Sequence, residues 1–138
     1  MAKNKIGLNF KGFEEYAERL DKLGGDIKKA TEKALQATHD HITPKLAADI
    51  KKHHLTGATE RSLNKDAKVM WSGSTAEIKV GFKISQGGLP SIFLMYGTPR
   101  MKKDQQLYND IFGNTTKKEI AEIQREIFME EIKKTMGG

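Results

Sequence analysis

The segment Thr75-Ala76-Glu77-Ile78-Lys79-Val80-Gly81-Phe82-Lys83-Ile84-Ser85 marks where the chain changes from helical to strand periodicity. Apolar residues occupy every second position of this segment, from residue 76 to residue 84. Because alternate residues of a strand point to opposite faces, the pattern predicts a half-buried strand. Ala67, Val69 and Trp71 alternate in the same way, and the intervening Ser72-Gly73-Ser74 predicts a hairpin turn.

A second apolar run, Ser91-Ile92-Phe93-Leu94-Met95-Tyr96, stops abruptly at Gly97-Thr98-Pro99. It follows a glycine-rich loop, 86–90, and it is apolar at both odd and even positions. Such a run predicts a strand that is covered on both faces. Together with the hairpin, it predicts a small antiparallel sheet of three strands, or slightly more, arranged as a meander.

Helical periodicity is found on both sides of the predicted sheet. Apolar residues spaced as i, i+3, i+4 and i+7 predict a first helix that begins at Phe13 and ends at Gly24-Gly25. Asp26 is expected to cap a long helix over 26–54, kinked at Pro44; the alternative is a new helix that begins at Pro44.

Two helices are predicted after the sheet. One is short and lies near residues 107–112. The other follows a capping box, Thr116 to Glu119, and runs to about residue 135. The expected fold is therefore α+β, with the long kinked N-terminal helix and the C-terminal helix packed on the sheet.

The length of 138 residues predicts a single domain, 1–138. Within it we expect an N-terminal arm (1–12), a helical part (13–63), a sheet (67–98) and C-terminal helices (104–136). The chain has no cysteine, which excludes disulfides and thiolate metal sites. No stretch approaches the ~18 apolar residues that a membrane span needs. We expect a soluble, unexported protein that makes no membrane contact.

The net charge of +6 comes from 24 basic and 18 acidic residues and invites a nucleic-acid hypothesis. The basic residues are mostly lysine, and their pairs are scattered among acidic residues. Bidentate contacts to phosphate and guanine favour arginine instead. A solvated surface of mixed charge is the favoured interpretation, and a small basic nucleic-acid-binding domain is the alternative.

The spacing of histidine, acidic and glycine residues does not match a catalytic or metal-binding motif. His39 and His41, like His53 and His54, are not spaced at i and i+4, as paired helical metal ligands would be. The helical glutamates alternate with lysine or arginine, which is typical of solvated ion pairs. No phosphate-binding glycine motif is present in the sequence. We therefore expect no enzymatic activity, no metal and no cofactor.

Several short motifs follow one another in an order that resembles the head–tail joining and tail-completion proteins, the neck or minor tail proteins of long-tailed phages and prophages. They are Phe10-Lys11-Gly12-Phe13, Leu20-Asp21-Lys22-Leu23-Gly24, the alanines Ala30, Ala34 and Ala37, Thr56-Gly57-Ala58-Thr59-Glu60-Arg61-Ser62-Leu63, and Phe93-Leu94-Met95-Tyr96-Gly97-Thr98. The first two flank and end a helix. The fourth looks like the Thr-Gly-x-Leu-x-x-Ser pattern of that family, and the last looks like its aromatic-Gly-Thr ending.

This resemblance implies a structural virion protein without enzymatic activity. Such proteins assemble as homo-oligomeric rings, commonly hexamers, between the head connector and the tail tube. The implied partners are other copies of the chain, connector proteins, tail-tube proteins and, through non-specific contact, DNA passing through a lumen. The implied locations are the virion neck and, during assembly, the host cytoplasm. The motif positions expected to bind partners are Thr56, Gly57, Tyr96, Gly97, Thr98 and Arg100.

Overall fold

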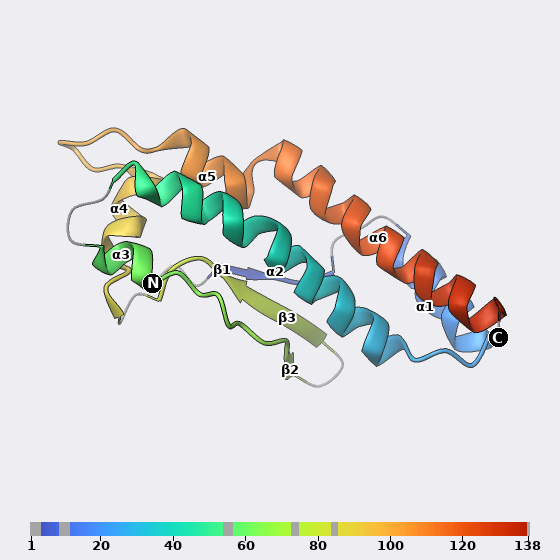
Figure 1. Ribbon diagram of the computed structural model, residues 1–138. Coiled ribbons are helices and arrows are strands. Elements are labelled where there is room, and N and C mark those ends of the chain that lie inside the picture. Colours follow the sequence, from blue (N-terminus) through green and yellow to red (C-terminus); the bar gives the residue numbers. More distant parts are fainter. Residues whose placement is uncertain (1–3, 9–11, 54–56, 73–74, 84–85, 138) are drawn as a thin grey trace.

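The structure, a computed structural model, describes residues 4–8, 12–53, 57–72, 75–83 and 86–137 (Figure 1). Along the chain, its elements are β1 (Asn4–Ile6), α1 (Phe13–Lys22), α2 (Ile27–Lys51), α3 (Ala58–Arg61), β2 (Met70–Ser72), β3 (Thr75–Val80), α4 (Leu89–Tyr96), α5 (Gln105–Phe112) and α6 (Asn114–Gly137). This mixture of helices and strands confirms the predicted α+β class.

Helix α2 is the central element of the molecule. It packs on β3 on one side and on α5 and α6 on the other (Figure 1). Its buried apolar side chains belong to three clusters. Towards the sheet, Leu35 packs with Ala76 and Ile78. In the C-terminal half of α2, Ile42, Leu46 and Ile50 pack with Leu107, Ile111 and Ile120, and in its N-terminal half, Ala30 and Ala34 pack with Leu20, Phe128 and Ile132. Every other layer is therefore positioned by α2.

The long helix is continuous through its proline. It begins where the Asp26 side chain accepts a hydrogen bond from the Lys29 amide at 3.0 Å, and it passes Pro44 without ending. Pro44 has no amide hydrogen, so the Asp40 carbonyl lacks the hydrogen bond that it would otherwise accept within the helix. Both residues are exposed, so water can bind this carbonyl instead. The expectation of one long helix is confirmed, and the alternative of a new helix at Pro44 is wrong.

The sheet contains the predicted hairpin but is not a meander. β2 and β3 pair antiparallel with Trp71 opposite Ala76, and the turn residues 73–74 lie outside the described residues. β1 pairs antiparallel with the other edge of β3, which gives the strand order β1-β3-β2. The third strand therefore comes from the segment predicted to be an N-terminal arm (1–12), and the expected third strand at 92–96 is wrong.

The segment 92–96 is helical and forms most of α4. Pro90 lies in the first turn, where its missing amide costs no hydrogen bond. The Ser91 hydroxyl donates to the Gly88 carbonyl at 2.6 Å, and Gly97, at φ +78°, follows the last helical residue. A short apolar run fits a covered strand or a partly buried helix equally well by periodicity. These end signals and the absence of a strand beside it among the described residues select the helix.

Helix α6 packs mainly on α2 and α1, and α2 separates most of it from the sheet (Figure 1). The expectation that the C-terminal helix packs on the sheet is therefore wrong. The predicted capping box is also wrong. α6 begins at Asn114, the buried Thr116 hydroxyl donates to the Asn109 carbonyl at 2.7 Å, and Glu119 pairs with Lys45 of α2.

Candidate functional site

Helix α4 exposes an apolar stripe. Leu94 and Met95 point into the core, whereas Leu89, Phe93 and Tyr96 are 46, 45 and 49% exposed. These three residues are spaced at i, i+4 and i+7, so they share one face of the helix. Met101, 39% exposed, follows in the turn after α4. We call Leu89, Phe93, Tyr96 and Met101 the α4 surface.

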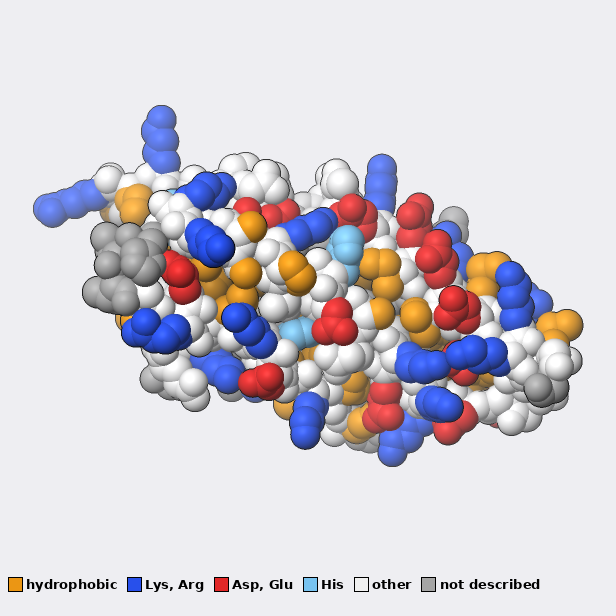
Figure 2. Space-filling model, in the orientation of Figure 1, with side chains coloured by type: hydrophobic (Ala, Val, Ile, Leu, Met, Phe, Trp, Pro, Cys, Tyr) orange, Lys and Arg blue, Asp and Glu red, His pale blue; other side chains and the backbone are white. Residues whose placement is uncertain are grey.

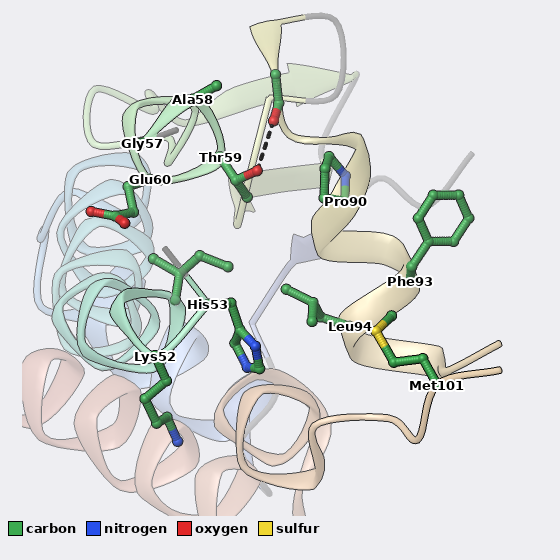
Figure 3. Close-up of a pocket in the computed structure, with 12 residues that line it drawn as sticks. Lys52, His53, Gly57, Ala58, Thr59, Glu60, Pro90, Phe93, Leu94 and Met101 are labelled. Carbon is green, nitrogen blue, oxygen red and sulfur yellow. Dashed lines mark hydrogen bonds between the residues drawn. The ribbon is translucent and has the colours of Figure 1, made fainter. Parts of the chain in front are cut away.

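An apolar cavity of about 670 Å³ lies beside the α4 surface, between α4, α3 and the end of α2. Figure 3 shows Leu94 directed into this cavity, which Phe93 and Met101 also line. The α3 side is held close, because the Thr59 hydroxyl donates to the Gly87 carbonyl at 3.1 Å. A Cβ atom at Gly87, whose φ is +99°, would lie 3.1 Å from the Ala58 carbonyl oxygen. A hollow and a set of projecting apolar side chains therefore adjoin one another.

The sequence-predicted partner-binding residues fall into two groups around this cavity. Gly57 lines the cavity at the start of α3 with φ +83°. Tyr96, Gly97, Thr98 and Arg100 lie at the end of α4 and in the turn after it.

Thr56 lies outside the described residues. The structure thus brings the two sequence motifs to the same end of the molecule, although about 40 residues separate them in the chain. None of the five described positions except Tyr96 carries an apolar side chain that projects into water.

The turn after α4 is held by backbone hydrogen bonds. The Thr98 amide donates to the Met101 carbonyl at 2.8 Å, and the Met101 amide donates back at 3.1 Å. The Arg100 amide donates to the Thr98 hydroxyl at 3.2 Å, and its side chain is exposed. Gly97 is constrained as well, because a Cβ atom there would lie 3.0 Å from the Lys103 amide nitrogen.

Aromatic and charged contacts attach this turn to α5. The rings of Tyr96 and Tyr108 meet edge to face, with centroids 5.9 Å apart, and the Lys103 ammonium lies 4.4 Å from the Tyr108 ring. At the edge of the cavity, His53 Nε2 lies 2.7 Å from Asp104 Oδ2. Burial would raise the pKa of Asp104, but hydrogen bonds from His53 and from the Leu107 amide hold it below its ordinary value. The turn is therefore a fixed part of the surface.

Two carboxyl groups meet in the interface between α2 and α5. Asp49 and Asp110 are 7 and 6% exposed, and the Gln106 amide donates to Asp110 at 2.9 Å. Burial, followed by hydrogen bonding to Asp110 and repulsion from it, raises the pKa of Asp49 to about 7.

The two carboxyl groups can bond to each other only when one of them carries a proton. Without that proton, Asp49 Oδ2 has no partner among the described residues. No sequence pattern pointed to this pair, because Asp49 and Asp110 are far apart in the chain and each occurs in an ordinary helical pattern.

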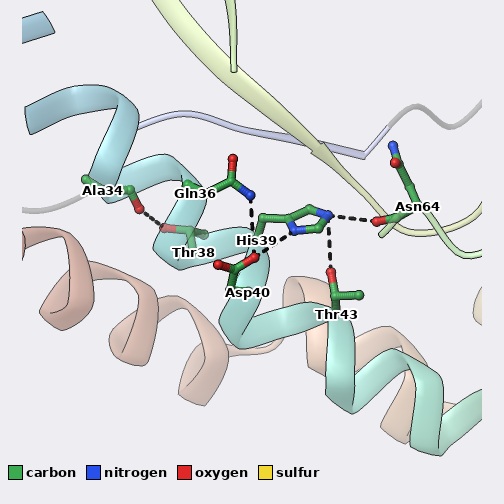
Figure 4. Close-up of polar contacts among 7 residues, drawn as sticks. All are labelled: Ala34, Gln36, Thr38, His39, Asp40, Thr43 and Asn64. Carbon is green, nitrogen blue, oxygen red and sulfur yellow. Dashed lines mark hydrogen bonds and ion pairs between the residues drawn. The ribbon is translucent and has the colours of Figure 1, made fainter. Parts of the chain in front are cut away.

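The three histidines that the structure describes, His39, His41 and His53, do not gather around one point. His39 is buried, and its Nε2 donates to the Asn64 carbonyl at 2.7 Å (Figure 4). His41 Nε2 lies 3.5 Å from Glu119, and His54 lies outside the described residues. In the described ranges, no three His, Cys, Asp or Glu side chains are arranged to hold a metal ion.

Comparisons of the chain with known protein families, with curated proteins and with solved structures find no match. No helix in the described part of the chain is both long enough and apolar enough to cross a membrane.

Proposed function

We propose that the chain is a structural virion protein of the head–tail joining or tail-completion class, a neck component of a long-tailed phage or prophage. In this role it self-associates into a ring, commonly of six copies, between the head connector and the tail tube. Its sites of action are the virion neck and, before assembly is complete, the host cytoplasm. The observation that carries the proposal is the α4 surface beside an apolar cavity.

Exposure of this kind favours a docking role. Among the described residues, eight large apolar side chains are exposed, and four of them form the α4 surface. Covering apolar surface contributes about 25 cal/mol per Å², so a contiguous patch is a candidate interface. Single exposed apolar residues, such as Met70, need no such explanation.

The positions of the motifs support the same role. Gly57 borders the cavity, Tyr96 belongs to the α4 surface, and Gly97 and Thr98 follow it directly in the chain. Two of the motifs that carry the resemblance, 56–63 and 93–98, therefore have residues next to the proposed interface. A shared assembly surface would explain why the two occur together in one chain.

Self-association is the first test of this proposal. We expect light scattering after size exclusion, with negative-stain imaging, to show concentration-dependent oligomers that include rings. Phe93→Ser should weaken self-association by roughly ten- to a hundredfold, because burying a Phe side chain contributes about 1.5–3 kcal/mol. Met70→Ser is the matched control, since Met70 on β2 is 44% exposed against 45% for Phe93.

Two results would count against the proposal. One is a wild-type chain that stays monomeric at every concentration and yields no cross-linked oligomer. The other is a Phe93→Ser variant that assembles as well as the Met70→Ser control. The first would remove self-association altogether, and the second would remove α4 from the interface.

A basic turn favours contact with DNA as a second function. Arg100, Lys102 and Lys103 are exposed in the turn after α4, and residues 97–103 carry no acidic side chain. Figure 2 shows Lys and Arg side chains predominating over this end of the visible face. Such a turn can meet the phosphate backbone without reading sequence. This is also the feature that best suits the alternative of a small basic nucleic-acid-binding domain.

Salt dependence of DNA binding tests this second function. Binding of a DNA duplex of random sequence should fall linearly with the logarithm of salt concentration, and Lys102→Gln with Lys103→Gln should reduce the slope by about 2. The matched control is Lys117→Gln with Lys118→Gln, an exposed pair in the first half of α6. An unchanged slope would exclude the turn from DNA contact.

A further inference from the structure

If copies of this chain meet through the α4 surface, the partner face is either the same surface or a different one. Contact between two α4 surfaces would be isologous and would bring two basic turns together. Arg100 and Lys102 flank Met101 directly and are both exposed, so their like charges would repel across such a contact. The counter-surface should therefore be a different part of the chain that combines apolar and acidic side chains.

The end of the molecule that holds α1 and the C-terminus of α6 has this combination. It lies opposite the end that holds α3 and α4 (Figure 1). Leu23 is 42% exposed and Met136 is 64% exposed. Their helices are held together by the buried cluster of Leu20, Phe128 and Ile132. Two exposed apolar side chains therefore lie at the C-terminal ends of two helices that pack on each other.

Helix α1 adds the acidic component. Glu14, Glu18 and Asp21 are exposed and are spaced at i, i+4 and i+7, so they share one face. Leu89, Phe93 and Tyr96 have the same spacing on α4. Of the six charged residues in α1, four are acidic, whereas residues 97–103 carry three basic charges and no acidic one. The acidic face of α1 is therefore complementary to the basic turn, while Lys22, which pairs with Glu18 at 3.5 Å, and the exposed Lys133 and Lys134 add positive charge beside Leu23 and Met136.

We infer that the α4 surface of one copy seats the α1 end of a second copy, with Leu23 and Met136 supplying apolar contact and the α1 carboxylates facing the basic turn. This inference rests on the proposed self-association and names its counter-surface. The contact is heterologous, so it leaves a free α4 surface at one end and a free α1 end at the other. Repetition closes a ring where the rotation allows, and otherwise extends a filament.

Cysteine cross-linking tests the contact directly, because the natural chain has no cysteine to interfere. Phe93→Cys protein and Leu23→Cys protein are prepared separately and then mixed in equal amounts with a short bismaleimide. Both positions are exposed and outside the buried clusters, so folding should be retained. Thr115→Cys, an exposed position on the first turn of α6 away from both surfaces, is the control.

Cross-linked dimers should form in the mixture with a yield at least about tenfold greater than in either protein alone. The same difference is expected against mixtures with the Thr115→Cys control. A tenfold difference corresponds to about 1.4 kcal/mol in effective affinity. The double variant Phe93→Cys with Leu23→Cys should give a ladder of higher oligomers. Dimers from Phe93→Cys protein alone would overturn the inference and leave the proposed self-association standing. No product from any mixture, with a monomeric wild type, would overturn both.

Charge reversal gives a second readout that leaves the apolar residues in place. Arg100→Glu with Lys102→Glu should weaken self-association about tenfold, equal to about 1.4 kcal/mol. Glu14→Lys with Glu18→Lys should do the same. A mixture of the two double variants should associate with each other as wild-type copies do, and the inference fails if the mixture associates no better than either variant alone.

Discussion

At the residue scale, Asp49 and Asp110 place two acidic groups where the packing of α2 against α5 leaves almost no water. Other side-chain contacts between the α2 region and the C-terminal region join complementary groups. They are His53 with Asp104, Lys45 with Glu119, and Lys33 with Glu131. The contact between Asp49 and Asp110, by contrast, joins two groups of like charge. A shared proton relieves the repulsion, which ties the docking of α5 to pH.

The sign of this dependence follows from the pKa of Asp49, about 7 in the folded chain against 3.8 ordinarily. The folded state holds a proton that the unfolded state releases between those values, so this group's contribution to stability falls as pH rises from about 4 to 7. The carboxyls of Asp104, Glu119 and Glu131 have lowered pKa values, so their contributions run the opposite way, increasing as pH rises through the acid range.

Asp49→Asn isolates the effect, because the amide can donate to Asp110 at any pH. Each pKa unit corresponds to about 1.4 kcal/mol, so the variant should be more stable than wild type at pH 8 by between about 1 and 4 kcal/mol. The difference should shrink towards pH 4. Urea unfolding at the two pH values measures it, with the exposed Asp66→Asn as control. An equal difference at both pH values would contradict the account of the pair.

At the element scale, the success of sequence reasoning depended on the length and locality of each signal. The first helix, the long helix and the helix near 107–112 were predictable from apolar spacing and, for the long helix, from the Asp26 cap. The β2–β3 hairpin was predictable from strict alternation. These signals are local and extend over several residues, so tertiary contacts had little to overturn.

Two elements could not be predicted because their structure depends on distant partners. The three residues of β1 become a strand by pairing with β3, more than 70 positions away in the chain. The apolar run in α4 is too short for its periodicity to separate a helix from a covered strand. The same limit applies to the site, since Gly57 and Tyr96 were expected to bind partners, but the cavity and the Asp49–Asp110 pair arise only when distant helices meet.

At the scale of the whole molecule, the chain has two unlike ends. One end presents the α4 surface, the apolar cavity and the basic turn, and the other presents α1 with its acidic face and two exposed apolar side chains. Unlike ends allow each copy to bind two neighbours at once, which a ring or filament requires. The proposed neck function depends on this polarity more than on any single side chain.

Hydrogen–deuterium exchange on the wild-type chain, compared between dilute monomer and concentrated assembly, tests the central claim most directly. Amides of α4 and of the turn 97–103 should exchange more slowly in the assembly, because docking covers them and suppresses local opening. Amides of β2 should be unchanged and serve as the internal reference. Protection that appears on other elements while α4 exchanges as fast as in the monomer would contradict the account.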